Sequence, residues 1–263
     1  MRTFIVLLTA LFLTCSAWPM QAAENYSDLM NRAGMQRMLS QRIAKAYLYN
    51  GQGISQQEAA HQLNIAVTRF QYNHDALKKV SNSEMQDLLG MVEAVFLSYK
   101  DLVTKPYKKE NVPAVLDFSE QLLAASQNAV LKLEEISGAK IDNIINISGR
   151  QRMLSQRIAK YYITYQAGFQ DESYVQNLET AVSEFQSALK ILRAEKRNTE
   201  RINLLLDKMQ TLWDRVAPYF LKIREKGNPS LVLTSTDDIN QLADEVTALY
   251  VEVAAAAAQN PSR

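Results

Sequence analysis

The sequence contains the same ten-residue stretch twice, and this duplication constrains the fold more than any other feature. Residues 36–45 read Gln-Arg-Met-Leu-Ser-Gln-Arg-Ile-Ala-Lys, and residues 151–160 repeat them without a change. When the comparison starts at Asn31 and Asn146, 12 of 15 positions agree. The same offset continues downstream without a gap and there pairs mostly apolar residues, as expected for two copies with similar cores. These downstream pairs include Leu63 with Leu178, Ala66 with Ala181, Val67 with Val182 and Phe70 with Phe185.

The rest of the chain is typical of an all-α protein. The 263 residues include only eight glycines and six prolines, which fall mainly between helical runs, and no strand-like alternation persists. We predict two tandem antiparallel four-helix bundles that arose by internal duplication. We expect residues 1–23 to be a signal peptide, residues 24–137 to form the first bundle and residues 138–263 the second.

Local signals place four helices in each half. In the first half we expect them over about 27–50, from 55 to a turn at 81–83, from 83 to Pro106, and over about 113–136. In the second half we expect about 140–166, 172–196, 199–226 and 237–258. Ser55 with Glu58 and Ser83 with Gln86 have the spacing of capping boxes.

The linker between the halves allows two arrangements. A turn at residues 137–139 (Ser-Gly-Ala) makes the first helices of the two bundles parallel neighbours, so that one chain forms a pseudo-dimer. A continuous helix over about 113–166 instead stacks the bundles end to end, and each motif then needs a homodimer for its partner. We favour the turn.

Each copy of the motif places an arginine on a helix face that otherwise carries small residues. At the helical period Arg37 aligns with Ala33, Ser40 and Ala44, and Arg152 aligns with the equivalent residues of the second copy. Small residues let another helix approach closely, which removes the guanidinium from water unless an anion or an internal carboxylate meets it. Arginine presents a planar fork of donors that suits a flat oxyanion.

The primary candidate site residues are Arg37, Arg152, Gly34, Gly149, Ser40 and Ser155. Secondary candidates are Arg42, Arg157, Tyr47 and Tyr162. For Arg42 and Arg157, a solvated basic edge closed by Lys45 and Lys160 is the better interpretation. For the two tyrosines, packing within the bundles is the better interpretation.

The run from Gly149 to Lys160 resembles the N-terminal, PilJ-type domain of type IV pilus methyl-accepting chemotaxis transducers. The shorter pattern Asn-x-Ala/Ser-Gly-x-x-Arg-Met-x-Ser-x-Arg is similar to the periplasmic sensing domain of nitrate/nitrite sensor histidine kinases. This resemblance implies a four-helix sensing bundle in which the arginine before the methionine contacts an anion where two first helices meet. The matching residues are Arg37 and Arg152, with Gly34 and Gly149 allowing close approach.

The N-terminus and the charge balance suggest where the protein works. Arg2, the apolar run over 4–13 and the small residues up to Ala23 are typical of a cleaved secretory signal peptide, so we expect a periplasmic protein. A lipoprotein anchored through Cys15 is the weaker alternative, because Thr14 suits such a site poorly. After cleavage, basic and acidic side chains balance, which argues against nucleic acid as a partner.

No residues suggest catalysis or a cofactor. His61 and His74 are too far apart on one helix to form a metal site, and no glycine-rich phosphate loop follows a strand. We therefore predict a sensory module, not an enzyme, that binds a small oxyanion, nitrate or nitrite by resemblance. We expect this module to lack signalling helices of its own and to act with a membrane receptor or chemosensory partner. The alternative is a structural or adaptor bundle in which the arginine face binds a receptor or a pilus partner.

Overall fold

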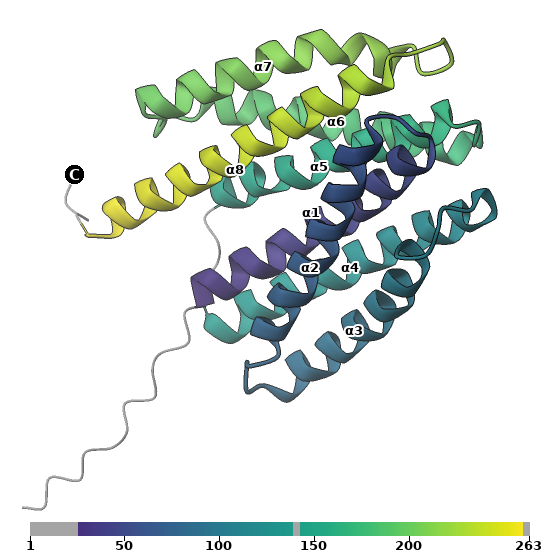
Figure 1. The fold of residues 1–263 in the computed structure, drawn as a ribbon. Helices are drawn as coiled ribbons and strands as arrows, with labels where there is room; N and C mark the ends of the chain where they lie inside the picture. The colour runs from purple at the N-terminus through teal and green to yellow at the C-terminus, as the bar shows by residue number, and fades with distance from the viewer. Residues whose placement is uncertain (1–25, 139–142, 260–263) are drawn as a thin grey trace, which may run out of the picture.

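The computed structural model describes residues 26–138 and 143–259, which form eight α-helices, one short 3-10 helix and no strand (Figure 1). In chain order the elements are α1 (Tyr26–Gly51), α2 (Gln56–Leu77), α3 (Ser83–Val103), η1 (Lys109–Asn111), α4 (Val112–Ser137), α5 (Asn143–Gln166), α6 (Glu172–Ala194), α7 (Glu200–Leu221) and α8 (Pro229–Gln259). The prediction of an all-α fold with two tandem helical bundles is confirmed. The predicted signal peptide and Ala139 lie outside the described residues.

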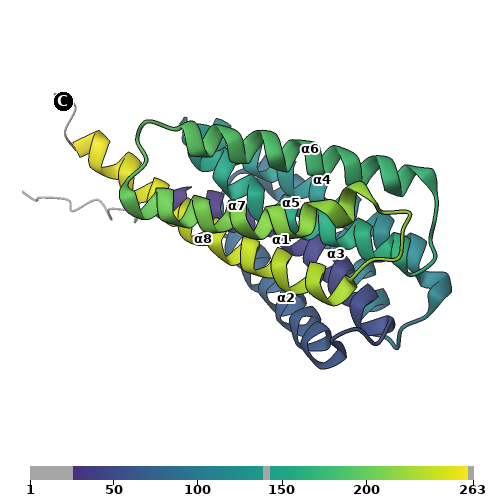
Figure 2. The ribbon, with the colours of Figure 1, turned by 90° about the horizontal axis from the view of Figure 1, so that it is seen from above.

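Helices α1 and α5 form the centre of the molecule. Helix α1 packs against α2 and α4 of its own bundle, α5 packs against α6 and α8, and α1 and α5 pack against each other (Figures 1 and 2). The two central helices run parallel, because Asn31 contacts Arg152 while Arg42, further along α1, contacts Gln156. The chain thus has the pseudo-dimer arrangement that the turn predicts.

The alternative of a continuous helix through the linker is wrong. Helix α4 ends at Ser137, and Gly138 adopts a left-handed conformation with φ of 65°, which glycine takes at little cost. The Gly138 N–H donates to the carbonyl of Glu135 and closes the last turn. The chain therefore leaves the α4 axis here, and α5 packs beside α1 instead of extending α4.

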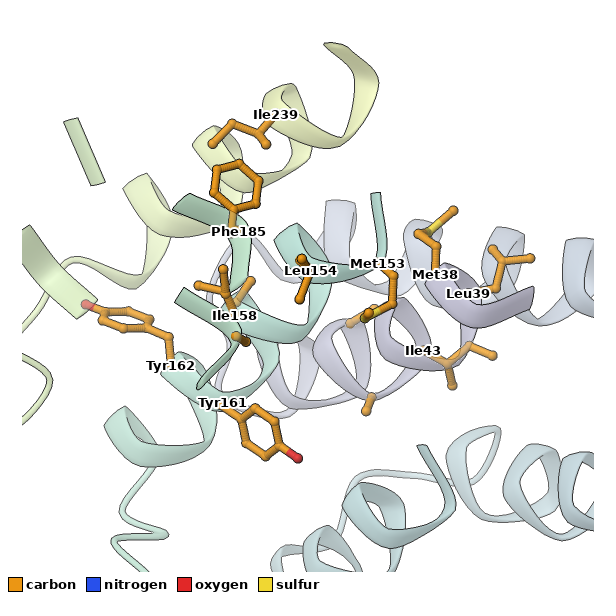
Figure 3. Close-up of a cluster of buried hydrophobic side chains, with 14 of the residues drawn as sticks. Met38, Leu39, Ile43, Met153, Leu154, Ile158, Tyr161, Tyr162, Phe185 and Ile239 are labelled. Atoms are coloured by element: carbon orange, nitrogen blue, oxygen red, sulfur yellow. The ribbon is translucent and has the colours of Figure 1, made fainter. Parts of the chain in front are cut away.

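The hydrophobic core follows the duplication. Phe70 on α2 stacks on Phe96 of α3 with ring centroids 4.4 Å apart, and Phe185 on α6 stacks on Trp213 of α7 at 4.3 Å. Between the bundles, Met38 of α1 and Met153 of α5 lie in one continuous buried cluster (Figure 3). Full burial of such side chains contributes about 1.5–3 kcal/mol each. One core therefore joins both repeats.

Three predicted helix boundaries need correction. Ser55 does not cap α2, because its backbone is left-handed with φ of 46° and its side chain makes no capping hydrogen bond. At the start of α3 the capping residue is Asn82, whose Oδ1 accepts from the N–H of Met85 at 2.9 Å, and not Ser83. Helix α7 ends at Leu221, short of the predicted Lys226.

The last helix also begins earlier than predicted, at Pro229 instead of Asp237. Proline suits the first helical position, where its missing N–H has no intrahelical partner. The Asn228 side chain accepts from the N–H of Leu231 at 3.1 Å and caps the helix. This longer α8, which packs against α5 and α7, contains Asp237 within its length. Within the described ranges, no helix is both long and apolar enough to span a membrane.

Candidate anion site between the two repeats

The small residues that accompany the two arginines face helices of their own bundles. Ala33 packs in a buried cluster with residues of α2, α3 and α4, and the carbonyl of Ser40 accepts from the hydroxyl of Tyr99 on α3. In the second repeat, the side chain of Asn240 on α8 contacts Ser155. Ala33, Ser40 and Ala44 of α1 are fully buried, and Ser148, Ser155 and Ala159 of α5 are almost fully buried. The arginine side chains on these faces are also withdrawn from solvent, with 7% of Arg37 and 4% of Arg152 exposed.

The two guanidinium groups converge on Gly34. A Cβ atom at Gly34 would lie 3.4 Å from Nη2 of Arg37 and 4.0 Å from Nη2 of Arg152. Gly149 lies in the same way beside Arg152, whose Nη2 would be 3.3 Å from a Cβ there. The absence of side chains at both glycines thus lets the guanidinium groups lie against the helix backbones.

The partners of the two arginines differ in charge. Nη1 of Arg152 donates to Oδ1 of Asp244 at 2.6 Å, and the same guanidinium lies 3.4–3.5 Å from Oδ1 of Asn31. Nη1 of Arg37 also donates at 2.6 Å, but its acceptor is the neutral amide oxygen of Gln127. In the part of the chain that the structure describes, Arg37 forms no ion pair with a carboxylate.

The lack of a carboxylate partner affects the pKa of Arg37. Burial is the main cause, and the charges of Arg152 and Arg150 add to it, so the pKa falls from its ordinary value to about 10. Arg37 therefore remains a cation at neutral pH. A buried cation beside a second cation is unfavourable unless an anion joins them.

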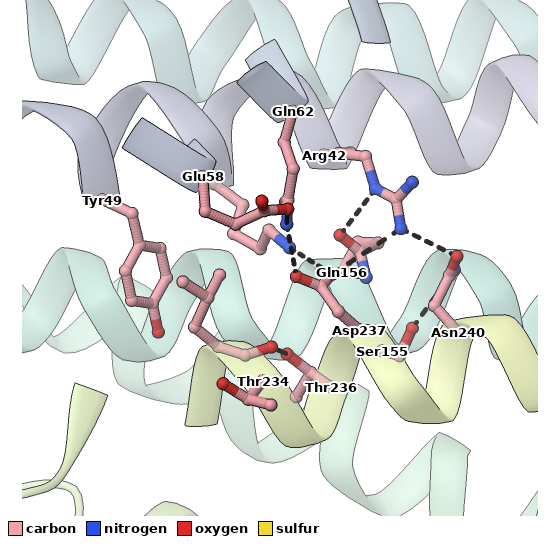
Figure 4. A network of polar contacts seen from close by, with 12 residues as sticks. Arg42, Tyr49, Glu58, Gln62, Ser155, Gln156, Thr234, Thr236, Asp237 and Asn240 are labelled. Carbon is pink, nitrogen blue, oxygen red and sulfur yellow. Dashed lines mark hydrogen bonds and ion pairs between the residues drawn. The ribbon is translucent and has the colours of Figure 1, made fainter. Parts of the chain in front are cut away.

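The interpretation of the basic residues that follow each arginine as a solvated edge was wrong, because Lys45 and Lys160 are buried and Arg42 and Arg157 are partly buried, and all four form ion pairs. Lys45 is fully buried, and its Nζ donates to Oδ1 of Asp237 on α8 at 2.5 Å. Arg42 donates to Gln156 at 3.1 Å and to Asn240 at 2.9 Å, and it lies 3.6 Å from the same Asp237 carboxylate (Figure 4). The first repeat thus places two cations on an acid of the second repeat.

The second repeat forms the reciprocal contact. Lys160 is also fully buried, and its Nζ donates to Oε1 of Glu120 on α4 at 2.5 Å. Arg157 pairs with the other oxygen of Glu120 at 2.9 Å. Burial lowers the pKa of both Lys45 and Lys160 to about 8, although the two carboxylates oppose the shift. These four cations, each paired with a carboxylate of the other repeat, link the two repeats.

The remaining candidates are not brought to the arginines. Ser40 and Ser155 lie one turn along, and their hydroxyls donate to the carbonyls of Arg37 and Arg152 in their own helices. Tyr47 lies about 15 Å further along α1 at 1.5 Å per residue, where its hydroxyl accepts from the N–H of Lys108. Tyr162 packs edge-on against Phe220. These tyrosines form part of the bundle cores.

The residues that sequence reasoning missed are the acceptors on α4 and α8. Glu120 and Asp237 lie 117 positions apart, and so do Gln127 and Asp244. The repeated motif on the first helices has an offset of 115 residues, two fewer than the offset of the fourth helices. An ungapped comparison therefore does not align the fourth helices. That shift, once found, would have pointed to all four residues.

Comparison with known families agrees with this architecture. The family model described as "Type IV pili methyl-accepting chemotaxis transducer N-term" (PilJ) matches twice, over residues 18–129 and 140–259. The chain therefore belongs to the PilJ family, a family of sensory domains of chemotaxis transducers and not of enzymes. Neither the curated proteins nor the solved structures gave a significant match. The likeness to nitrate/nitrite sensors thus rests on the motif alone.

Proposed function

We propose that this protein is a periplasmic sensory module that binds one small oxyanion, of the nitrate or nitrite type, between Arg37 and Arg152. The observation that carries this proposal is the buried Arg37 guanidinium, whose hydrogen-bonded partner is a neutral amide and whose neighbour is a second guanidinium. An oxyanion between the two groups would accept hydrogen bonds from both forks and offset their repulsion.

The location of the site suggests how binding produces a signal. Arg37 belongs to α1 of the first repeat and Arg152 to α5 of the second, so an anion that touches both links the two bundles. Drawing the two cations together would shift α1 relative to α5 along their shared face. Helix shifts of about 1–2 Å at such contacts are a common switching movement. A membrane receptor or chemosensory partner would then detect the displaced helix.

Thermal unfolding in the presence of different anions tests the proposal. At fixed ionic strength we expect nitrate or nitrite to raise the melting temperature. A ligand at about 100 times its Kd adds about 2.7 kcal/mol to the free energy of unfolding. Arg37→Gln should abolish the increase. The control Arg193→Gln, which removes an exposed arginine paired with Asp207, should leave it unchanged.

Circular dichroism of Arg37→Gln would verify that the helices persist. Equal melting temperatures across nitrate, nitrite, acetate, sulfate and chloride would contradict anion binding. The adaptor hypothesis would then remain, in which the arginine face binds a carboxylate of a protein partner.

A further inference from the structure

The two repeats differ in charge at one position that touches the arginines. Gln127 on α4 and Asp244 on α8 occupy equivalent places, since each accepts from Nη1 of the arginine in its own repeat at 2.6 Å. The neighbouring equivalent pair, Glu120 and Asp237, has an acid in both repeats. The charge difference between Gln127 and Asp244 is thus specific to the arginine pair.

Together, the two arginines and the Asp244 carboxylate carry one net positive charge. Arg37 and Arg152 contribute two cations, and the Asp244 carboxylate neutralises one of them through a direct ion pair. Arg150 also repels Arg37, but it is half exposed and paired with Glu184 at 2.8 Å. Glu134 attracts Arg37 more weakly than either arginine repels it.

We infer that Asp244 sets the charge of the ligand: it occupies Arg152 as an internal anion and restricts the site to a singly charged oxyanion held mainly by Arg37. This inference rests on the proposed function. A doubly charged anion would place its second charge next to the Asp244 carboxylate, in a region where Arg37 and Arg152 are almost fully buried. An unpaired charge in such a place is strongly unfavourable. Asp244 itself has a half-exposed side chain, so its replacement is compatible with the fold.

Exchanging the two acceptors tests the inference. Asp244→Gln gives the second repeat the neutral acceptor of the first, which frees Arg152 and leaves two positive charges. We expect this variant to bind sulfate about tenfold or more tightly than the wild type, relative to nitrate. Gln127→Asp gives Arg37 a carboxylate of its own and should weaken nitrate binding about tenfold or more. The double variant Gln127→Asp/Asp244→Gln restores one net charge and should recover the preference for nitrate.

Isothermal titration calorimetry with nitrate and with sulfate measures all four proteins. The matched control is Glu245→Gln. Glu245 follows Asp244 in the sequence, but its side chain forms an ion pair with Arg201 at the surface. This variant therefore removes one negative charge from a surface ion pair. It should keep the wild-type ratio of the two affinities, and thermal unfolding would show that every variant is folded.

The outcomes separate this inference from the proposed function. If the wild type binds nitrate but Asp244→Gln leaves the ratio of nitrate to sulfate affinity unchanged, Asp244 does not select the ligand charge, while anion binding stands. If the wild type binds sulfate as tightly as nitrate, the inference about Asp244 also fails, while anion binding stands. If the wild type binds neither anion, both the inference and the proposed function fail.

Discussion

Lys45 and Lys160 are fully buried, and the carboxylate that neutralises each of them comes from the other repeat. Asp237 also receives hydrogen bonds from Gln62 and Gln156, so it lies at the centre of a network that spans four helices, α1, α2, α5 and α8. Burial alone would raise the pKa of Asp237, but the charges of Lys45 and Arg42 together lower it below its ordinary value. The carboxylate is therefore ionised when the protein is folded.

Removal of this charge should destabilise the protein. Asp237→Asn keeps the shape of the side chain but leaves Lys45 buried without a counter-charge, which we expect to cost about 3 kcal/mol. Urea unfolding of the wild type and the variant measures the loss. Asp238→Asn removes the same charge from an exposed neighbour and should change the free energy of unfolding by less than about 0.5 kcal/mol. Equal effects of the two variants would show that the Lys45 pair contributes little.

Single residues also show what the sequence alone reveals of the site. The arginines were found because each repeats on a face of small residues, a pattern that lies within one helix. The burial of Lys45 was missed because its partner, Asp237, is 192 positions away and reaches it only through tertiary packing. For the same reason the sequence did not show that Arg152 has a carboxylate partner and Arg37 an amide.

At the scale of the helix, periodicity located all the described α-helices, but their ends depend on single hydrogen bonds. Asn82 and Ser83 are adjacent, and both are residue types that cap helices, so sequence spacing did not decide between them. The backbone of Asn82 is extended, and its side chain reaches the N–H of Met85. Pro229 likewise lies outside the predicted range of the last helix, although proline favours the first position of a helix.

The α3 cap provides a direct comparison of the two neighbours. Asn82→Ala removes the acceptor for the Met85 N–H and should lower the free energy of unfolding by about 1 kcal/mol. Ser83→Ala lies inside the helix, where alanine is well tolerated, and should be neutral or slightly stabilising. Chemical denaturation of both variants gives the two values. A larger loss for Ser83→Ala than for Asn82→Ala would contradict this assignment of the cap.

The whole molecule combines two PilJ-type repeats into one unit with a shared central contact. The parallel α1 and α5 bring one arginine from each repeat to the same place, and the crossed pairs Lys45–Asp237 and Lys160–Glu120 hold the repeats together beside it. The duplication predicted this arrangement, because two equivalent helices joined by a turn become parallel neighbours. Under the proposed function, we therefore expect one anion site per chain and not one per repeat.

Nuclear magnetic resonance of protein labelled with ¹⁵N-arginine tests this claim most directly, because the guanidinium Nε–H signals report on the arginines themselves. During a nitrate titration, the signals of Arg37 and Arg152, assigned with Arg37→Gln and Arg152→Gln variants, should shift together and saturate at one anion per chain. The signal of the exposed Arg193 should stay in place. If neither Arg37 nor Arg152 responds, or if the two saturate independently, a single anion site between the repeats is ruled out.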